Sequence, residues 1–292
     1  MRIACVQTDV VFGQPMANAK ALVRKLIELK SASVDLAVFP EAFLTGYCVN
    51  TAKEAEQISI HANADENHEI LTADGSISVI QGMTDQLDIG CVVGFAGNKG
   101  FGHLNENLPC ELYNGAILFE PGKTPRRYIK THLPFLGYDR FAEPGTALDV
   151  FNTKWGKIGI LICFDQRPPE AARTLALKGA ELIVLPTNWP IGAEVSAEHM
   201  SIARAAENKV FMATCNRVGT ENGTTFIGRS KIIDTRGRVL ESAGDGEEIL
   251  ISDIDLQEAR EKRIVNIPGE YEMEVFKSRQ PNLYKIIGKT VQ

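Results

Sequence analysis

The 292-residue chain has an ordinary composition, with 44% hydrophobic and 23% charged residues and a formal net charge of −6. Lys and Glu alternate without forming a basic stripe, and an aromatic content of 7% offers no row of stacking platforms, so we expect no nucleic-acid partner. The first residues read as a strand and not as a signal peptide, and no apolar run approaches the roughly 18 residues of a membrane span. We therefore expect a soluble cytoplasmic protein with no membrane partner.

The six cysteines lie far apart, without a C-x-x-C pair or a His/Cys cluster. This pattern argues against a disulfide framework and against a structural zinc site. Cys5, Cys91 and Cys215 lie inside strand patterns, where a free cysteine is usually a small buried hydrophobic residue. Cys48 and Cys110 lie in loop sequences and have no evident partner.

Short, apolar, β-branched runs recur along the chain and predict strands. Several of them are apolar almost without alternation, which indicates strands covered on both faces. The predicted strands are residues 3–8, 35–40, 89–97, 115–120, 157–163, 181–186, 210–218, 230–235 and 247–255.

Helical patterns lie between these runs. Residues 16–31 repeat apolar side chains at helical spacing, residues 169–180 open with proline and end near a glycine, and residues 196–210 begin with Ser196 as a candidate N-cap. The order of strand, helix and strand predicts an α/β layered fold. A weak echo between DLAVFPEAF and ELIVLPTNW indicates two similar halves. No linker divides the chain, so we predict a single domain over residues 1–292.

Cys163 ends a predicted strand and is followed by FDQRPPEAAR, a turn into the next helix. Ligands of α/β folds bind at the C-terminal ends of strands, and a helix N-terminus there is expected to lower the pKa of the thiol. A free thiol, with a pKa of roughly 8.5, also needs an activating neighbour. Among the histidines only His132 lies close in sequence to another candidate, Lys130, so a Cys–His pair is poorly supported.

Two further strand ends carry charged groups. Glu41 directly follows the run at 35–40, and Lys130 ends an apolar-flanked stretch. Taken alone, Glu41 could be a solvated loop carboxylate and Lys130 a surface charge. However, three strands that each deliver one polar group to the same edge form the arrangement that a reaction centre requires, with the carboxylate and the ammonium group paired.

Three segments then resemble a known family. FPEAFLTGY (39–47), YIKTHLP (128–134) and LICFDQRPPE (161–170) are similar, in order, to the Glu, Lys and Cys signature segments of the nitrilase (carbon-nitrogen hydrolase) superfamily. The similarity covers nearly the whole chain and includes ARAAENKVFMATCNRVG (203–219), GRSKIIDTRG (228–237) and SRQPNLY (278–284). It implies a four-layer αββα sandwich that often pairs into an αββααββα dimer, so we expect a homodimer or a larger homo-oligomer.

The resemblance also implies a mechanism. Cys163 would attack a carbonyl carbon, while Glu41 would take the thiol proton and pass it to the departing nitrogen. A thioester would remain until water, activated by Glu41, releases it. Lys130 and the backbone N–H of Phe164 would stabilise the oxyanion. No metal or organic cofactor is required.

The sequence departs from the family at one carboxylate. Many members carry a second glutamate after the lysine, a few residues before a Pro-Gly pair. Here the stretch reads KTHLPFLGYDRFAEPG, with Gly137 or Tyr138 near the expected place. Asp139 is the closest substitute, and Glu143 is the alternative.

The segment PTNWPIGAE (186–194) follows a strand at the same edge, which makes Asn188 and Trp189 candidate pocket walls, although Trp189 is equally suited to plain packing. Charges at the pocket are expected to indicate the substrate, because a cation favours a carboxylate-bearing molecule and an acidic mouth favours an amine. Arg140, Arg167 and Glu194 are the charged side chains to place.

The segment CFDQRPPE resembles the amidase and carbamoylase branches more than the nitrilases, which usually carry Trp-Glu after the nucleophile. We therefore predict a hydrolase that acts on a small amide or N-carbamoyl substrate and releases ammonia. A nitrilase and a thioester-forming acyltransferase are the alternatives. A non-catalytic binding protein on the same fold would be expected to have lost one of the three groups, and all three are present.

Overall fold

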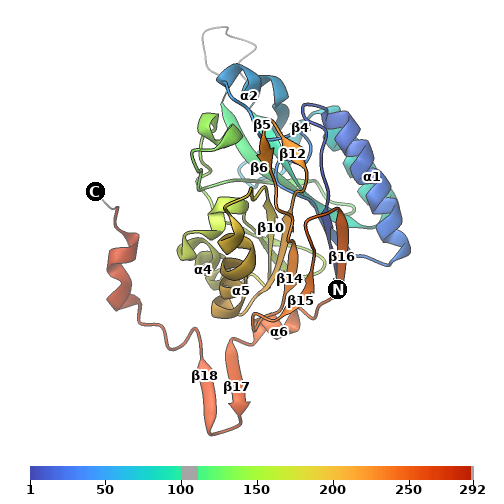
Figure 1. Ribbon diagram of the computed structural model, residues 1–292. Helices are drawn as coiled ribbons and strands as arrows, with labels where there is room; N and C mark the ends of the chain where they lie inside the picture. The colour runs from blue at the N-terminus through green and yellow to red at the C-terminus, as the bar shows by residue number, and fades with distance from the viewer. Residues whose placement is uncertain (100–110, 291–292) are drawn as a thin grey trace.

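The computed structural model describes residues 1–99 and 111–290, so Cys110 lies outside the described residues. Two main β-sheets lie face to face, and helices cover the outer face of each (Figure 1). The predicted four-layer αββα sandwich is thereby confirmed. Each predicted strand is present, although its bounds are shifted by a few residues.

The first sheet has three parallel strands at its centre, β1, β2 and β5; β16 and β6 are antiparallel to their neighbours, whereas β3 runs parallel to β5. Helices α1 (Pro15–Ser31) and α3 (Gly75–Leu87) pack on its outer face, and α2 (Ala52–Ile58) lies near one end. Its strands, in spatial order, are β16 (Glu248–Asp253), β1 (Arg2–Gln7), β2 (Leu36–Val38), β5 (Gly90–Asn98), β3 (Ile60–Ala64) and β4 (Ile70–Ala73), with β6 (Leu112–Phe119) joining β5 to β7 (Arg126–Ile129).

The second sheet repeats this plan, with β9, β10 and β11 parallel and β14 antiparallel to β11. Helices α4 (Pro169–Leu177) and α5 (Ser201–Asn208) cover it. A π-helical turn, Ser196–Met200, precedes α5, so Ser196 lies inside a turn and does not cap the helix as predicted. The strands, in spatial order, are β15 (Val239–Ser242), β14 (Lys231–Ile233), β11 (Phe211–Asn216), β10 (Leu182–Thr187), β9 (Lys157–Ile160) and β8 (Val150–Asn152).

Alternate side chains of the central strands enter different cores, which explains why these strands are apolar throughout. In β1, Cys5 packs between the two sheets, whereas Ala4 packs under the helices. In β10, Val184 packs between the sheets and Ile183 faces α4 and α5. Burial on both faces therefore fixes each strand at its place in the sandwich.

The weak sequence echo corresponds to a structural repeat. β2 carries DLAVFP and β10 carries ELIVLP, and each is the middle one of three parallel strands in its sheet. A helix, α1 or α4, precedes each of them. The two sheets are thus built from similar units packed face to face.

The last part of the chain stands away from this body (Figure 1). It comprises the hairpin β17 (Arg263–Ile267) and β18 (Tyr271–Glu274) and the 3-10 helix η5 (Pro281–Gly288), and we call residues 263–290 the C-terminal arm. Two smaller elements complete the fold: α6 (Gln257–Arg260) precedes the arm, and the short hairpin β12 (Thr220–Glu221) and β13 (Thr224–Thr225) follows β11 within the body. Across residues 1–99 and 111–290, no helix is long and apolar enough to cross a membrane.

Candidate active site

The structure brings Glu41 and Lys130 into direct contact. Glu41 follows β2 and Lys130 follows β7, and both side chains are fully buried. The Nζ of Lys130 lies 2.7 Å from Oε1 of Glu41. The charges of both residues act on the pKa of Cys163, which follows β9, so the three predicted residues share one region.

Asp139, the expected substitute for the second glutamate, contacts Lys130. It lies in the 3-10 turn η2 (Gly137–Phe141), and its Oδ2 is 2.6 Å from Nζ of Lys130 and 2.8 Å from the hydroxyl of Tyr47. Glu143, the alternative, is exposed, and the hydrogen bond recorded for it joins its backbone N–H to Leu112. Asp139 is thus the candidate that contacts Lys130, and its supporting role stays a prediction.

Asn114 completes the cluster and was missed in the sequence. Its Nδ2 donates to Oε1 of Glu41 at 2.7 Å and to Oδ1 of Asp139 at 2.8 Å, from the middle of β6. A carboxamide inside a strand that is buried along its whole length needs polar partners, because an unpaired buried amide is costly. An asparagine in the apolar run LYNGAILF was the signal that could have identified it.

Glu41 is held by one carboxylate oxygen only. Oε1 accepts from Lys130 and Asn114, whereas the buried Oε2 has no hydrogen-bond partner among the described residues. Burial raises the pKa of Glu41 above its ordinary value, the charge of Lys130 opposes this, and the charge of Asp139 adds to it. The orientation leaves Oε2 available to receive a proton.

Lys130 remains an ammonium ion in this setting. Burial alone would lower its pKa, but the carboxylates of Asp139 and Glu41 raise the pKa of Lys130 well above its ordinary value. A permanently charged donor is thus fixed between two carboxylates in a site that excludes water.

Cys163 has a left-handed backbone, with φ of +47°, at the start of the four-residue turn η3 (Cys163–Gln166). Burial raises the pKa of its thiol, and the charge of Glu41 raises it further, against the opposing effects of Lys130 and a backbone hydrogen bond from Asn188. The expected lowering of this pKa by a helix N-terminus is therefore wrong. A short turn follows the nucleophile, and α4 begins only at Pro169.

The remaining predicted residues are distributed around Cys163. Phe164 is the second residue of η3, where backbone N–H groups have no partner within the turn, and its side chain is partly exposed. Asn188 is buried, and neither polar atom of its carboxamide has a partner among the described residues. Trp189 lies in the core under α4 and α5, so its indole packs against that core.

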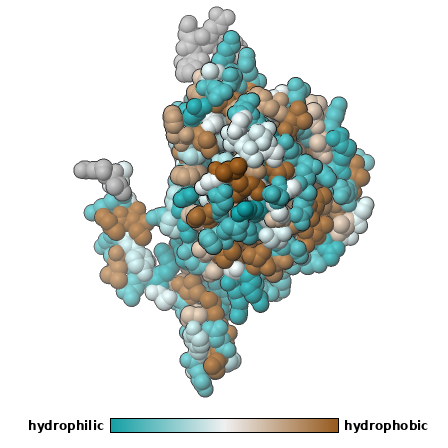
Figure 2. Space-filling model, in the orientation of Figure 1, coloured by the Kyte–Doolittle hydropathy of each residue, from teal (hydrophilic) through white to brown (hydrophobic). Residues whose placement is uncertain are grey.

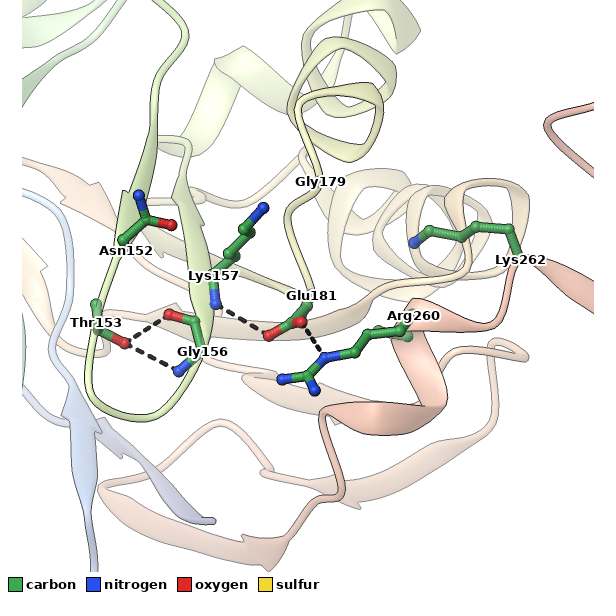
Figure 3. A pocket seen from close by; sticks show the side chains of 9 residues that line it. Asn152, Thr153, Gly156, Lys157, Gly179, Glu181, Arg260 and Lys262 are labelled. Carbon is green, nitrogen blue, oxygen red and sulfur yellow. Dashed lines mark hydrogen bonds and ion pairs between the residues drawn. The ribbon is translucent and has the colours of Figure 1, made fainter.

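A cavity of about 230 Å³ is lined by sequence neighbours of Tyr47 and Asp139. Arg140 is the charged side chain among its lining residues, which are Cys48, Val49, Asn50, Phe135, Leu136, Gly137, Arg140, Asn222 and Thr224. Arg167 is exposed and Glu194 is partly exposed, and neither lines this cavity. A larger cavity, of about 450 Å³, lies at the other ends of β9 and β10, around Lys157 and Glu181 and away from Cys163 (Figure 3).

In the described part of the chain, no group of three or more His, Cys, Asp or Glu side chains is placed to hold a metal ion. The groups that the structure does bring together are a thiol, two carboxylates and an ammonium ion. A nucleophile next to an oriented carboxylate and a fixed cation is suited to acyl transfer.

Comparisons with known proteins agree with this geometry. Residues 2–264 match the model of the carbon-nitrogen hydrolase family. The chain is 32% identical to a nitrilase from Pyrococcus abyssi, over 97% of this chain and 99% of that protein. It is 31% identical to a 2-oxoglutaramate amidase from Bacillus subtilis, over 89% and 93%.

A solved structure supports the fold independently. An amidase from Nesterenkonia sp. superposes with a TM-score of 0.77 at 23% identity, over 98% of this chain and 96% of that one. The family match and the two relatives cover nearly the whole chain. This chain therefore belongs to the carbon-nitrogen hydrolase family of the nitrilase superfamily.

Proposed function

We propose that the protein hydrolyses the C–N bond of a small amide or N-carbamoyl substrate, with Cys163 as nucleophile and Glu41 as general base and acid. The observation that carries this proposal is the unpartnered, buried Oε2 of Glu41, next to a thiol with a raised pKa. A thiol that is protonated at rest needs a base at the moment of attack. Glu41 is the carboxylate oriented to serve as that base.

The steps follow from these groups. Sγ of Cys163 bonds to the carbonyl carbon as its proton moves to Glu41, and the C–N bond then breaks while Glu41 returns the proton to the leaving nitrogen. Ammonia departs and a thioester remains. Water then gives a proton to Glu41 and adds to the thioester carbon, and the sulfur leaves as a thiol by taking that proton back.

Lys130 and the backbone N–H of Phe164 stabilise the oxyanion that forms in both halves of the reaction. Lys130 is held between Glu41 and Asp139, so it needs no reorganisation when charge develops on the substrate oxygen. The loss of one such donor typically costs about 3 kcal/mol of transition-state stabilisation. Asp139 and Asn114 support this arrangement without touching the reacting atoms.

The substrate proposal rests on charge and sequence. Arg140 lines the 230 Å³ cavity, and no acid is among the lining residues described there. This favours a substrate whose tail carries a carboxylate, such as an N-carbamoyl amino acid or an ω-amide of a diacid. The segment CFDQRPPE favours an amide over a nitrile.

A substrate panel tests the proposed activity. The purified protein is incubated with carboxylate-bearing amides, carbamoyl amino acids, neutral amides and nitriles, and ammonia is measured. We expect release from the first two groups and none from the Cys163→Ala variant. Ammonia from nitriles alone would point to a nitrilase, and transfer to an added amine without hydrolysis would point to an acyltransferase. Mass spectrometry of a trapped adduct at any residue other than Cys163 would overturn the assignment.

We also propose that residues 1–292 form one domain that pairs with a second copy. β1 and β16, from opposite ends of the body, are neighbours in one sheet. The C-terminal arm exposes a series of large apolar side chains, including Leu283 and Ile286, each 70% exposed, and Figure 2 shows hydrophobic surface on it. Apolar surface of this kind needs a cover.

Oligomeric state is checked by light scattering on a size-exclusion column. Replacing Leu283 and Ile286 by Glu is expected to shift a dimer or larger oligomer towards the monomer. Leu71 is 65% exposed but lies on the body, so Leu71→Glu is the matched control and should leave the mass unchanged. A monomeric parent protein would refute the pairing.

A further inference from the structure

A third buried carboxylate lies close to Cys163 in the chain, and the mechanism above does not use it. Asp165 is in the turn η3 and is fully buried. Its Oδ2 accepts from the backbone N–H of Ile162 at 2.9 Å and from the hydroxyl of Tyr128 at 2.8 Å. Its Oδ1 is contacted from Thr131 and His132 on the other side.

The contacts on the second side come from the segment that carries Lys130. Backbone N–H groups of Thr131 and His132 donate to Oδ1 at 3.2 and 2.8 Å, the Thr131 hydroxyl lies at 2.9 Å, and Nδ1 of His132 at 2.8 Å. Thr131 directly follows Lys130, and Ile162 directly precedes Cys163. One carboxylate thus bridges the two sheets at the residues that adjoin the reactive groups.

Asp165 also closes the turn that holds the nucleophile. Its backbone N–H donates to the carbonyl of Ile162 at 2.9 Å, while its carboxylate accepts from the Ile162 N–H. Cys163 and Phe164 lie between these two residues. The left-handed backbone of Cys163 is unfavourable for a residue with a Cβ, so the surrounding contacts must hold it in place.

We propose that Asp165 is a positioning residue, which fixes the Cys163 thiol and the Phe164 N–H relative to Lys130 and Glu41. The role rests on the proposed function, since it matters only if Cys163 is the nucleophile. Asp165 does not touch the substrate; it acts through the backbone on both sides. His132, which the sequence presented as a possible base for Cys163, instead contacts this carboxylate.

The replacement Asp165→Asn keeps the shape and removes an acceptor. Each carboxylate oxygen of Asp165 accepts from at least one backbone N–H group. The NH₂ group of an asparagine, in either orientation, would therefore face a donor and lose that hydrogen bond. We expect the turn to shift and kcat/KM for ammonia release to fall by about 100-fold, the loss that a misplacement of about 1 Å can cause. The fall should lie in kcat and not in KM.

Asp234→Asn is the matched control. Asp234 is also a buried turn carboxylate, 3% exposed, which accepts from the N–H groups of Arg236 and Arg238, but it lies between β14 and β15. Both variants should lower the melting temperature, and only Asp165→Asn should lower kcat. Equal kcat in Asp165→Asn and the parent, within threefold, would overturn the proposal.

The rate of Cys163 alkylation by iodoacetamide, followed by peptide mass spectrometry, provides a readout that needs no substrate. We expect this rate to fall at least tenfold in Asp165→Asn, with a changed pH profile, and to stay at the parent value in Asp234→Asn. The assay separates the two ideas: a parent protein that hydrolyses no amide refutes the proposed function, whereas unchanged alkylation in Asp165→Asn refutes the positioning role.

Milder variants cover the case in which Asp165→Asn does not fold. Tyr128→Phe and Thr131→Val each remove one hydroxyl donor to the carboxylate and keep the packing. Each should lower kcat by about three- to tenfold with KM unchanged, the range expected for one hydrogen bond. Full kcat in both variants, combined with lowered melting temperatures, would assign Asp165 to stability alone.

Discussion

Two ionic clusters of this protein each hold a buried cation between two carboxylates, but they differ in how many carboxylate oxygens have hydrogen-bond partners. Lys130 lies between Glu41 and Asp139, and Arg217 lies between Glu221 and Asp9. Both cations are almost fully buried. In both clusters the carboxylates offset the desolvation cost of burying the cation.

The clusters differ in whether every oxygen of the buried glutamate has a hydrogen-bond partner. Both oxygens of Glu221 are used, since Oε2 accepts from Arg217 at 2.7 Å and Oε1 accepts from the backbone N–H groups of Tyr47 and Cys48. Glu41 instead leaves Oε2 without a partner among the described residues. A saturated cluster braces the fold, whereas the unsaturated one keeps an acceptor for chemistry. The following variants test this distinction.

Glu41→Gln should have the largest effect. It keeps the shape but removes the base, so kcat should fall by roughly a thousandfold, within the range for general acid–base catalysis. The substitution changes the net charge of the ionised cluster of Glu41, Asp139 and Lys130 from −1 to zero, and Lys130 keeps its ion pair with Asp139. The free energy of unfolding in urea should therefore not fall. A variant that keeps a tenth of the parent kcat would show that another group is the base.

Glu221→Gln should have the opposite profile. The change removes the buried carboxylate partner of Arg217 and leaves it with Asp9, whose side chain is 43% exposed, whereas Lys130 in Glu41→Gln keeps the fully buried Asp139. The loss of a buried partner typically destabilises a protein by about 3 kcal/mol. Unfolding in urea measures this loss, and kcat at 25 °C should stay within threefold of the parent value. Intact stability with a large loss of kcat would contradict the assignment of this cluster to the fold.

Asp139→Asn should have an intermediate effect and move the pH profile. The reaction requires ionised Glu41, so activity is lost as pH falls through the pKa of Glu41, which burial raises above the ordinary glutamate value of about 4.3. The charge of Asp139 adds to that rise, so the variant should shift the acidic limb of kcat/KM to lower pH. We expect kcat to fall by about 10- to 100-fold, in the range that supporting groups around a catalytic centre contribute. An acidic limb that stays in place or moves up would refute the coupling.

Arg140→Gln should have the smallest effect, confined to binding. We expect KM to rise about tenfold for carboxylate-bearing substrates, which corresponds to one charge-assisted hydrogen bond, and to change less than twofold for neutral amides. Steady-state kinetics on matched pairs of acids and their methyl esters measures this difference. Equal changes for both members of a pair would remove Arg140 from the substrate site.

Much of the fold was predictable because burial on both faces leaves a plain pattern. The apolar strands and helices α1 and α4 have the predicted places, with bounds shifted by a few residues. The hairpin and 3-10 helix of the C-terminal arm were not predicted, because they rest on little of the core and their sequences show no clear periodicity. The short strands β3 and β4 were missed although Ile60, Ala62 and Ile70 are buried in the core, because their sequences IHANA and ILTA are short and mix polar with apolar residues.

At the site, Glu41, Lys130 and Cys163 could be named because they follow strands and belong to signature segments, and Asp139 because it lies near the place where the family pattern carries a second glutamate. Asn114 could not be assigned by that rule, because it lies within a strand. Its role depends on its contact with Glu41, which is distant in the sequence. The direction of the Cys163 pKa shift was mispredicted, because the sequence does not reveal how completely the thiol is desolvated or which charge lies nearest.

The two sheets each hold part of the reaction centre. Glu41 and Lys130 extend from the first sheet and Cys163 from the second, and the apolar layer between the sheets, together with the bridging carboxylate of Asp165, sets their separation. Catalytic activity therefore depends on the position of one sheet relative to the other. A small shift of one sheet relative to the other would abolish activity while every helix and strand remained intact. On heating or in denaturant, activity should therefore be lost before secondary structure.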